Sequence, residues 1–393
     1  MKMIEFSEAI EIVLKSVIPT GSETVSFADS PGRVLAKDIF SDINMPPFNK
    51  ATVDGFACHS EELGSDMEIV ETIAAGRIPI ISPASGQCSR IMTGAAVPPG
   101  CDIVFMVEHS LIQASGKVKF TGTSSKDNIS PLGEDIKTGD CVIKRGRLLK
   151  IQDVPVLASV GCTLVEVKKM PVISVISTGS ELVEPEEKPG IAQIRNSNGW
   201  QLLSQIKRAG AMGRYRGIAH DDKEETFNII EKALSESDIV ILTGGVSMGD
   251  FDFVPSVLEK AGVNILFSRV NVQPGKPTTF GIHPKALVFG LPGNPVSAFV
   301  QFELLVRPLI YRMMDCSWKP LTFPLRMKES YSRRSPDRQA FIPVSITDDG
   351  MVLPVEYHGS AHISSLVDAD GIIAVPSGIK SIEKGEMVDV RQI

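Results

Sequence analysis

Short apolar runs alternate with amphipathic stretches through the middle of the chain, residues 169–316. The runs at 171–178, 263–272 and 286–293 predict strands, and the stretches at 196–210, 221–237 and 294–314 predict helices. Strands that alternate with helices in this way favour a mostly parallel sheet covered by helices on both faces. The middle of the chain is therefore predicted to be an α/β domain.

The two ends of the chain have a different pattern. Residues 1–168 begin with an amphipathic stretch that predicts a helix, and they continue as short β-rich runs broken by Gly and Pro. A proline-marked segment at 44–55 divides this block. We expect two N-terminal subdomains, about 1–45 with 140–168, and 46–139. Residues 317–393 are again short β runs and predict a small C-terminal β-barrel. The predicted fold class is multidomain α/β plus β.

Composition and charge narrow the class of protein. The chain has 393 residues, of which 43 % are hydrophobic and 22 % charged, as in ordinary globular proteins. A net charge of -7 argues against a nucleic-acid-binding protein. No signal peptide or membrane span is expected, because the start is acidic and no apolar run is long enough. Six scattered cysteines without a CxxC pair predict a reducing, cytoplasmic location rather than a disulfide framework or zinc site.

The turns that follow the predicted strands of the middle block are rich in glycine or acidic residues. In chain order they contain Glu181, then Asp221 and Asp222, then TGGVSMGDFD at 243–252, then Lys276, then LPGNP at 291–295. Ligands of parallel α/β sheets bind outside the carboxyl ends of the strands, so these turns are expected to share one ligand.

The residue types in these turns indicate a phosphate-bearing ligand together with Mg²⁺. Glycines let backbone N–H groups approach an anion, and a lysine adds a point charge. Carboxylates at the same place would repel a phosphate unless a divalent cation lay between them, and Mg²⁺ commonly binds one or two carboxylates plus phosphates. Two structural alternatives remain open. Asp221 and Asp222 could cap the next helix, and Glu181 could interact with a helix dipole.

Polar turns also occur in the N-terminal block, at 52–57, 90–100 and 132–139. Taken alone, the turn with Asp54 is an ordinary turn signal. The tight turn at 93–100 offers Thr93 and free backbone amides. No Ser-His-Asp or Cys-His arrangement can be recognised in the sequence.

Six motifs together resemble one known family. They are PPFNKATVDGFA, RIMTGAAVPPG, STGSEL, TGGVSMGDFDFV, VQPGKPTTFG and LPGNPVSAF, in that order. They are similar to the molybdopterin molybdenumtransferase family, the MoeA-like group that includes the E domain of gephyrin, and the resemblance covers almost the whole chain. It implies a transferase that joins molybdate to adenylylated molybdopterin, with Mg²⁺-dependent release of AMP, to form molybdenum cofactor.

The resemblance also implies an elongated homodimer whose active site lies between the α/β domain of one subunit and the N-terminal region of the other. A molybdopterin adenylyltransferase is an implied partner. Two rival functions are adenylyl transfer to molybdopterin by the α/β block, and a non-catalytic scaffold with the same fold. The full-length architecture and the acidic residues retained at the motif positions favour molybdenum insertion.

Carried over by motif, the implied catalytic residues are Asp54, Thr93, Asp135, Asp222 and Asp252. The implied substrate-binding residues are Thr178, Gly179, Gly244, Gly245, Ser247, Gly275, Lys276, Pro292, Gly293, Asn294 and Pro295. The implied metal ligands are Glu181, Asp250 and Asp252. The chain departs from the family pattern where Phe56 replaces a tyrosine, Ser180 an acid and Gln273 a lysine, and it lacks an arginine before GED.

Overall fold

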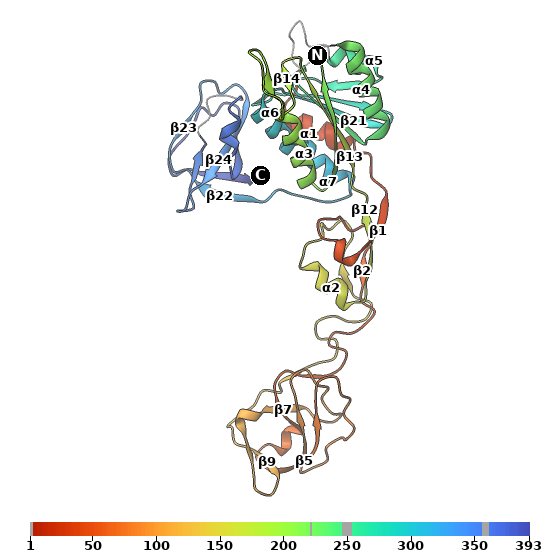
Figure 1. Cartoon of the computed structure of the whole chain (residues 1–393). Helices are drawn as coiled ribbons and strands as arrows, with labels where there is room; N and C mark the ends of the chain where they lie inside the picture. Colours follow the sequence, from red (N-terminus) through yellow and green to blue (C-terminus); the bar gives the residue numbers. More distant parts are fainter. Residues whose placement is uncertain (1–2, 221, 246–253, 356–360) are drawn as a thin grey trace.

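The computed structural model describes residues 3–220, 222–245, 254–355 and 361–393. The chain is elongated, with a β-rich module at one end and an α/β domain at the other (Figure 1). A small middle module joins them, and the C-terminal β domain lies beside the α/β domain.

A six-stranded sheet forms the centre of the α/β domain, in the order β16-β13-β17-β21-β20-β18. Its strands are β13 (Val172–Thr178), β16 (Met212–Ala219), β17 (Ile239–Thr243), β18 (Asn264–Phe267), β20 (Thr279–His283) and β21 (Ala286–Leu291). The first four strands in this order are parallel, and β20 is antiparallel to both β21 and β18. The mostly parallel sheet is confirmed.

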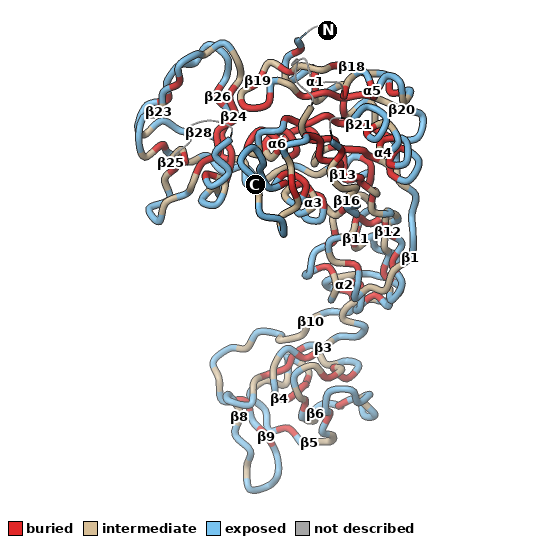
Figure 2. The backbone as a smooth tube through the Cα atoms, turned by 45° about the horizontal axis from the view of Figure 1, so that its top comes forward, coloured by how far each residue is buried: buried red, intermediate tan, exposed pale blue. Residues whose placement is uncertain are grey.

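Helices cover both faces of this sheet. They are α1 (Phe6–Lys15), α3 (Asn198–Arg208), α4 (Lys223–Glu236), α5 (Val254–Lys260), α6 (Pro295–Gln301) and α7 (Arg307–Met313). Alternation along β17 sends Ile239 and Ile241 to one hydrophobic cluster, and Val240 and Leu242 to the other. The buried residues of the molecule concentrate here (Figure 2).

The N-terminal helix α1 belongs to the core of the α/β domain. Ile4, Ala9 and Val13 lie in the same buried cluster as the strands β13 and β17, although they are far from them in sequence. The backbone of Ile4 also forms a parallel bridge with Val270. The helix therefore fastens the start of the chain to the α/β domain.

The last long helical segment of the domain is interrupted by a π-helical turn, η4 (Phe302–Val306), between α6 and α7. Pro308 lies in the first turn of α7. Proline has no N–H to donate to the carbonyl group four residues earlier, so the regular α-helical pattern cannot pass through this point. A single helix predicted from the sequence at 294–314 is therefore three consecutive helical segments.

The N-terminal region contains two parts. The distal module has a sheet of six strands in the order β7-β4-β6-β5-β9-β8. Its strands are β4 (Gly55–Cys58), β5 (Asp66–Ile73), β6 (Gln87–Ile91), β7 (Ile103–Met106), β8 (Ser110–Ile112) and β9 (Lys117–Phe120). The ribbon formed by β3 (Lys50–Ala51) and β10 (Ile129–Ser130) leads out of it.

The middle module pairs segments from both ends of the N-terminal region. It contains β1 (Ser22–Ser26) paired with β12 (Leu164–Lys168), β2 (Ile39–Phe40) paired with β11 (Cys141–Ile143), and α2 (Asp153–Ser159). The chain thus enters the distal module and returns through this same module. The domain boundaries at 168/169 and 316/317 stay a proposal.

The C-terminal strands form a small barrel. Its strands are β22 (Thr322–Arg326), β24 (Gln339–Ile346), β25 (Val352–Pro354), β26 (Gly371–Val375) and β28 (Met387–Gln392), with the short pair β23 (Tyr331–Ser332) and β27 (Ser381–Ile382) beside them. Pairing runs from β25 through β24, β26 and β28 to β22. A bridge between Met327 and Val352 then closes the circuit. The predicted fold class, multidomain α/β plus β, is confirmed.

Two further features concern the whole chain. No helix within the described ranges is long and apolar enough to cross a membrane. The structure pairs none of the six cysteines in a disulfide. Burial raises the pKa of both Cys58 and Cys88 to about 12, so these two thiols stay neutral.

Candidate active site

Three glycine-containing turns meet at the carboxyl ends of the parallel strands. They follow β13, β17 and β21, which are neighbours in the sheet. The amide of Gly244 donates to the carbonyl oxygen of Leu291 at 3.2 Å. The hydroxyl of Thr178 donates to the carbonyl oxygen of Thr243 at 3.4 Å. Three of the five turns predicted from the sequence to share a ligand are therefore joined directly.

Glycine is required at the centre of this cluster because the backbone segments approach so closely. Gly244 and Gly245 have φ of +96° and +59°, values that residues with a Cβ rarely adopt. A Cβ on Gly244 would overlap the carbonyl oxygen of Thr178, and a Cβ on Gly293 would lie 3.5 Å from the Cα of Gly244. The turns thus form a surface of bare backbone, as an anionic ligand requires.

Asn198 fixes two of the turns to each other. Its Nδ2 donates to the Thr243 hydroxyl at 2.9 Å and to the Gly293 carbonyl oxygen at 2.7 Å. The side chain is buried, and its Oδ1 has no hydrogen-bond partner among the described residues. Sequence reasoning missed this residue, although the signal was present: three polar residues, 196–198, stand at the start of a helix at the same edge of the sheet.

Lys276 lies on a loop that the α/β domain and the barrel both hold. The loop follows β19 (Val272–Gln273), which pairs with β24 of the barrel sheet, and it leads into β20 of the α/β sheet. Gly275 has a φ of +98° and packs against Gln301, whose Nε2 donates to the Pro274 carbonyl oxygen at 2.9 Å. The Lys276 side chain is exposed, as an anion-binding cation must be.

The run 263–272, predicted as one strand, is in fact divided between two sheets. Residues 264–267 form β18 at the edge of the α/β sheet, while 272–273 form β19 in the barrel sheet. The antiparallel strand β20 was not predicted at all. Its Gly281 is packed tightly against β18, where the backbone of Asn264 would crowd a side chain, and a glycine inside a short run weakens the strand signal.

Glu181 is the predicted metal ligand that the structure describes. It is exposed in the turn after β13, and its carboxylate folds over Gly179, where a Cβ would overlap it. One carboxylate beside a phosphate-accepting backbone suits Mg²⁺, which fills its remaining positions with phosphate and water. Within the described part of the chain, no group of three or more His, Cys, Asp and Glu residues could hold a metal. Ser247, Asp250 and Asp252, predicted members of the site, lie outside the described residues, as does Asp221.

Asp222 has a structural role that the sequence left open. It is the N-cap of α4, and its Oδ1 accepts hydrogen bonds from the amides of Glu224 at 2.9 Å and Glu225 at 2.7 Å. The capping alternative is thus realised at this position. Its assignment to catalysis stays a prediction.

Asp54 and Thr93 lie in the distal module, and Asp135 lies in the segment between β10 and β11 that leads back from it. The carboxylate of Asp54 accepts two hydrogen bonds from Thr93, from the amide at 2.6 Å and from the hydroxyl at 2.7 Å. Asp135 is exposed in the bend that follows β10, and its amide donates to the carbonyl oxygen of Met45 at 2.9 Å. In one chain the distal module lies at the opposite end from the α/β turns (Figure 1).

The two hydrogen bonds from Thr93 lower the pKa of the Asp54 carboxyl, and Arg90 adds a smaller electrostatic effect in the same direction. Asp54 is therefore an anion at neutral pH and a weak proton acceptor. This electronic character fits placement of a cation better than general-base catalysis. Phe56, a departure from the family pattern, is fully buried and stacks on Phe105 with ring centroids 5.4 Å apart. Its side chain is part of the hydrophobic core.

We expect the substitution Thr93→Val to raise the pKa of Asp54 towards its ordinary value, because it removes the hydroxyl donor and leaves the amide donor. A lowered pKa contributes stability above the pH at which a free Asp titrates, and this contribution is lost as pH falls through the lowered pKa. The substitution should narrow the pH range over which this contribution to stability is lost. NMR titration of the Asp54 carboxyl carbon, assigned with Asp54→Asn, measures the shift. Thr93→Ser keeps the hydroxyl and should titrate like the original protein; equal values for Val and Ser would contradict the assignment.

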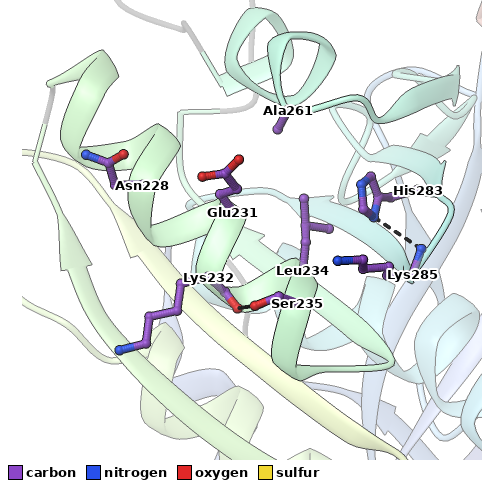
Figure 3. A pocket seen from close by; sticks show the side chains of 8 residues that line it. All are labelled: Asn228, Glu231, Lys232, Leu234, Ser235, Ala261, His283 and Lys285. Atoms are coloured by element: carbon purple, nitrogen blue, oxygen red, sulfur yellow. Dashed lines mark hydrogen bonds between the residues drawn. The ribbon is translucent and has the colours of Figure 1, made fainter.

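A separate cavity of about 440 Å³ lies at the other edge of the sheet, between α4 and the turn joining β20 to β21 (Figure 3). Its side chains include Glu231, His283 and Lys285. Nδ1 of His283 accepts a hydrogen bond from the Lys285 amide at 3.2 Å, and burial lowers the pKa of this histidine. Since none of the predicted site residues lines this cavity, we do not assign it to the active site.

Models of three protein-family regions together match nearly the whole chain. Residues 4–161 match the MoeA N-terminal region (domain I and II), residues 174–312 a probable molybdopterin binding domain, and residues 326–393 the MoeA C-terminal region (domain IV). The fold and the glycine turns therefore define a multidomain transferase of molybdopterin metabolism. The chain belongs to the MoeA family.

Individual relatives agree with this assignment. The chain is 34 % identical to a molybdopterin molybdenumtransferase of Staphylococcus epidermidis over 98 % of this chain and 95 % of the relative. It is 32 % identical to one of Bacillus subtilis over 98 % and 93 %. A crystal structure of a molybdopterin biosynthesis MoeA protein from Pyrococcus horikoshii superposes with a TM-score of 0.87 at 27 % identity and covers 100 % of both chains.

Proposed function

We propose that this enzyme joins molybdate to adenylylated molybdopterin, with Mg²⁺-dependent release of AMP, to yield molybdenum cofactor. The observation that carries the proposal is the junction of the turns after β13, β17 and β21, which exposes bare backbone to an anion at the carboxyl edge of the sheet. The regions on both sides of the α/β domain match MoeA models, the α/β domain matches a probable molybdopterin binding domain, and the chain aligns with 95 % and 93 % of the two molybdenumtransferases named above. This supports insertion rather than adenylyl transfer by the α/β domain alone.

Mg²⁺ would be held by Glu181 together with Asp252 and its neighbour Asp250. When bound, the ion would neutralise phosphate charge and polarise the phosphoanhydride that links AMP to molybdopterin. The chain's own groups would position the reactants. The backbone of Gly244, Gly245 and Gly293 would receive a phosphate, and Lys276 would hold a second anionic group, the pterin phosphate or molybdate.

We further propose a homodimer in which each active site draws on both subunits. Asp54, Thr93 and Asp135 would come from the distal module of one subunit, and the α/β turns from the other. The separation of the two groups within one chain supports this arrangement, because residues at opposite ends of one chain would meet only in an assembly of two chains (Figure 1). Thr93 and Asp135 would then orient the incoming oxyanion or a water molecule.

The direct test is an assay with purified protein, adenylylated molybdopterin, Mg²⁺ and molybdate. We expect release of AMP together with formation of active cofactor, and a protein that released neither would not have this function. Removal of Mg²⁺ by a chelator should stop the release of AMP.

Complementation between two inactive variants tests the shared site. Asp54→Asn and Asp252→Ala should each abolish activity as homodimers. If each site uses Asp54 from one subunit and Asp252 from the other, a fully exchanged mixture should regain about a quarter of the original activity, because half of the dimers then carry one intact site of two. Asp348→Ala, at an exposed acid of the barrel, is the control and should leave activity unchanged. A mixture that stays inactive after proven exchange would rule out the shared site.

A further inference from the structure

A cavity of about 540 Å³ adjoins the three turns and has no role in the function described so far. It is lined by Pro185, Glu186, Arg195, Asn196, Ser197 and Trp200, and its exposed lining is mostly apolar. The volume falls in the range of small-molecule sites, about 300–1,000 Å³. An apolar hollow beside a surface built for anions calls for a ligand that is apolar at one end and charged at the other.

Trp200 is the main apolar surface of this cavity. It lies in the first turn of α3, and 45 % of its surface is exposed, although the same helix buries Leu202 and Ile206 completely. On one side the indole packs against Tyr215 of β16, with ring centroids 5.4 Å apart. A large aromatic side chain held open at a cavity is a surface on which a planar ring can stack.

A polar network holds Tyr215, and therefore the indole that packs against it, in position. The Tyr215 hydroxyl donates to Oε1 of Glu184 and accepts from Nδ2 of Asn196, both at 2.6 Å. Asn196 Oδ1 in turn accepts from the Ser177 hydroxyl at 3.0 Å and from the Gly199 amide at 3.1 Å. Since Ser177 immediately precedes Thr178, this network connects the indole support to the end of β13. The stacking surface is thus preorganised rather than a loose side chain.

The cavity and the anion-binding turns share a border. Ser197 lines the cavity, and the next residue, Asn198, is bonded to Thr243 and Gly293 in the turns. Consecutive Cα atoms are about 3.8 Å apart, so the two features are immediate neighbours. Arg195 contributes a guanidinium group whose Nε is oriented by the carbonyl oxygen of Glu187 at 3.0 Å. A guanidinium plane stacks on aromatic rings.

From this geometry we propose that Trp200 and Arg195 form a subsite for the planar nitrogen heterocycle of the substrate, whose phosphate lies on the neighbouring glycine turns. The inference rests on the proposed function and deepens it. Two parts of that substrate carry such a ring, the adenine of the adenylyl group and the pterin. Both are planar rings of the kind that stack on an indole.

Binding of separate probes to full-length protein identifies the ring. AMP and 6-hydroxymethylpterin represent the two heterocycles, and ribose 5-phosphate represents a phosphate without one. The ring that occupies the subsite should quench indole emission. In Trp200→Phe, where Trp318 is the one remaining tryptophan of the sequence, the quenching should disappear while affinity stays within about threefold. Quenching by AMP assigns the subsite to the adenine ring, and quenching by 6-hydroxymethylpterin assigns it to the pterin ring.

Calorimetric titration of Trp200→Ala measures how much affinity the indole contributes. Affinity for the ring-bearing probe should fall about 5- to 150-fold, the usual loss when one base–aromatic stack is removed, while ribose 5-phosphate binds as before. Phe323→Ala removes another exposed aromatic ring, in the barrel, and should change neither affinity. Arg195→Gln should also lower the affinity for the ring-bearing probe.

Two results would overturn the subsite. One is unchanged affinity of Trp200→Ala for both heterocycles; the other is a Trp200→Ala protein whose dimer dissociates more readily while the probes bind normally, since Trp200 would then be an interface residue. The insertion assay separates this failure from that of the proposed function. A protein that releases AMP with the same KM with and without Trp200 retains the function and lacks the subsite.

Discussion

Replacement of Glu303 by Gln is expected to lower the free energy of unfolding of the α/β domain by about 3–5 kcal/mol, the usual cost of breaking a buried ion pair. Glu303 has no exposed surface. Its Oε1 accepts from Arg208 at 2.7 Å and from Gln205 at 2.8 Å, and its Oε2 accepts from Arg307 at 2.7 Å. In the Gln variant, an amide N–H group would replace one acceptor and face a cation in the protein interior.

The effect should extend to the docking of the barrel. Arg391 of β28 donates to the backbone carbonyl oxygen of Glu303, and the guanidinium groups of Arg391 and Arg307 lie 5.8 and 4.6 Å from the ring centroid of Trp318. Burial lowers the pKa of Arg391 to about 10, and Glu303 opposes this shift. The π-helical turn thus places one carboxylate where cations of the α/β domain and the barrel converge.

Denaturant unfolding followed by circular dichroism measures the change. Glu11→Gln is a matched control, because Glu11 pairs with Lys15 at the same four-residue spacing as Glu303 with Arg307, but on the helix surface. Exposed pairs of this kind contribute little, so the control should unfold like the original protein. Equal stability of the two variants would mean that the buried carboxylate does not stabilise the domain.

Substitution of Gly244 by Ala is expected to reduce AMP release at least about 100-fold, the scale of loss when reacting groups are displaced by about 1 Å. Gly244 has a positive φ, and an added Cβ would overlap the carbonyl oxygen of Thr178. The turn after β17 must therefore move away from the turn after β13. The backbone surface proposed to bind phosphate would be deformed.

A matched substitution separates backbone strain from this displacement. Gly217, in β16, has a φ of +90° but open space around the position of a Cβ. Gly217→Ala should therefore lose about 1–2 kcal/mol of stability from the left-handed conformation alone and keep its activity. If Gly244→Ala releases AMP as fast as Gly217→Ala does, the contact between the turns has no part in the reaction.

The alternation of strands and helices was sufficient to predict the α/β sheet, because β13, β17 and β21 are buried on both sides and read as continuous apolar runs. The pattern could not show which core a helix joins. An amphipathic helix such as α1 has the same spacing whether it covers its neighbours in sequence or a sheet far along the chain. Nor could it show where a run changes sheets, as at 263–272.

The site was predictable to a similar degree. Strand direction predicted that the turns with Thr178, Gly244 and Gly293 would meet, and the contacts among these turns confirm it. Asn198 was overlooked because asparagine near a helix start is ordinarily a cap. The Asn198 side chain joins two turns because of the direction in which it points. That direction depends on tertiary packing rather than on local sequence.

The loop with Lys276 connects the barrel sheet to the α/β sheet at the edge where the anion-binding turns lie. Gln273 is the last residue of a strand in the barrel sheet, and Thr279 is the first of a strand in the α/β sheet. The five residues 274–278 between them span at most about 18 Å when fully extended. Because this connection is short, a rotation of the barrel relative to the α/β sheet would displace Lys276. The pairing of β19 with the barrel sheet therefore constrains the position of this charge.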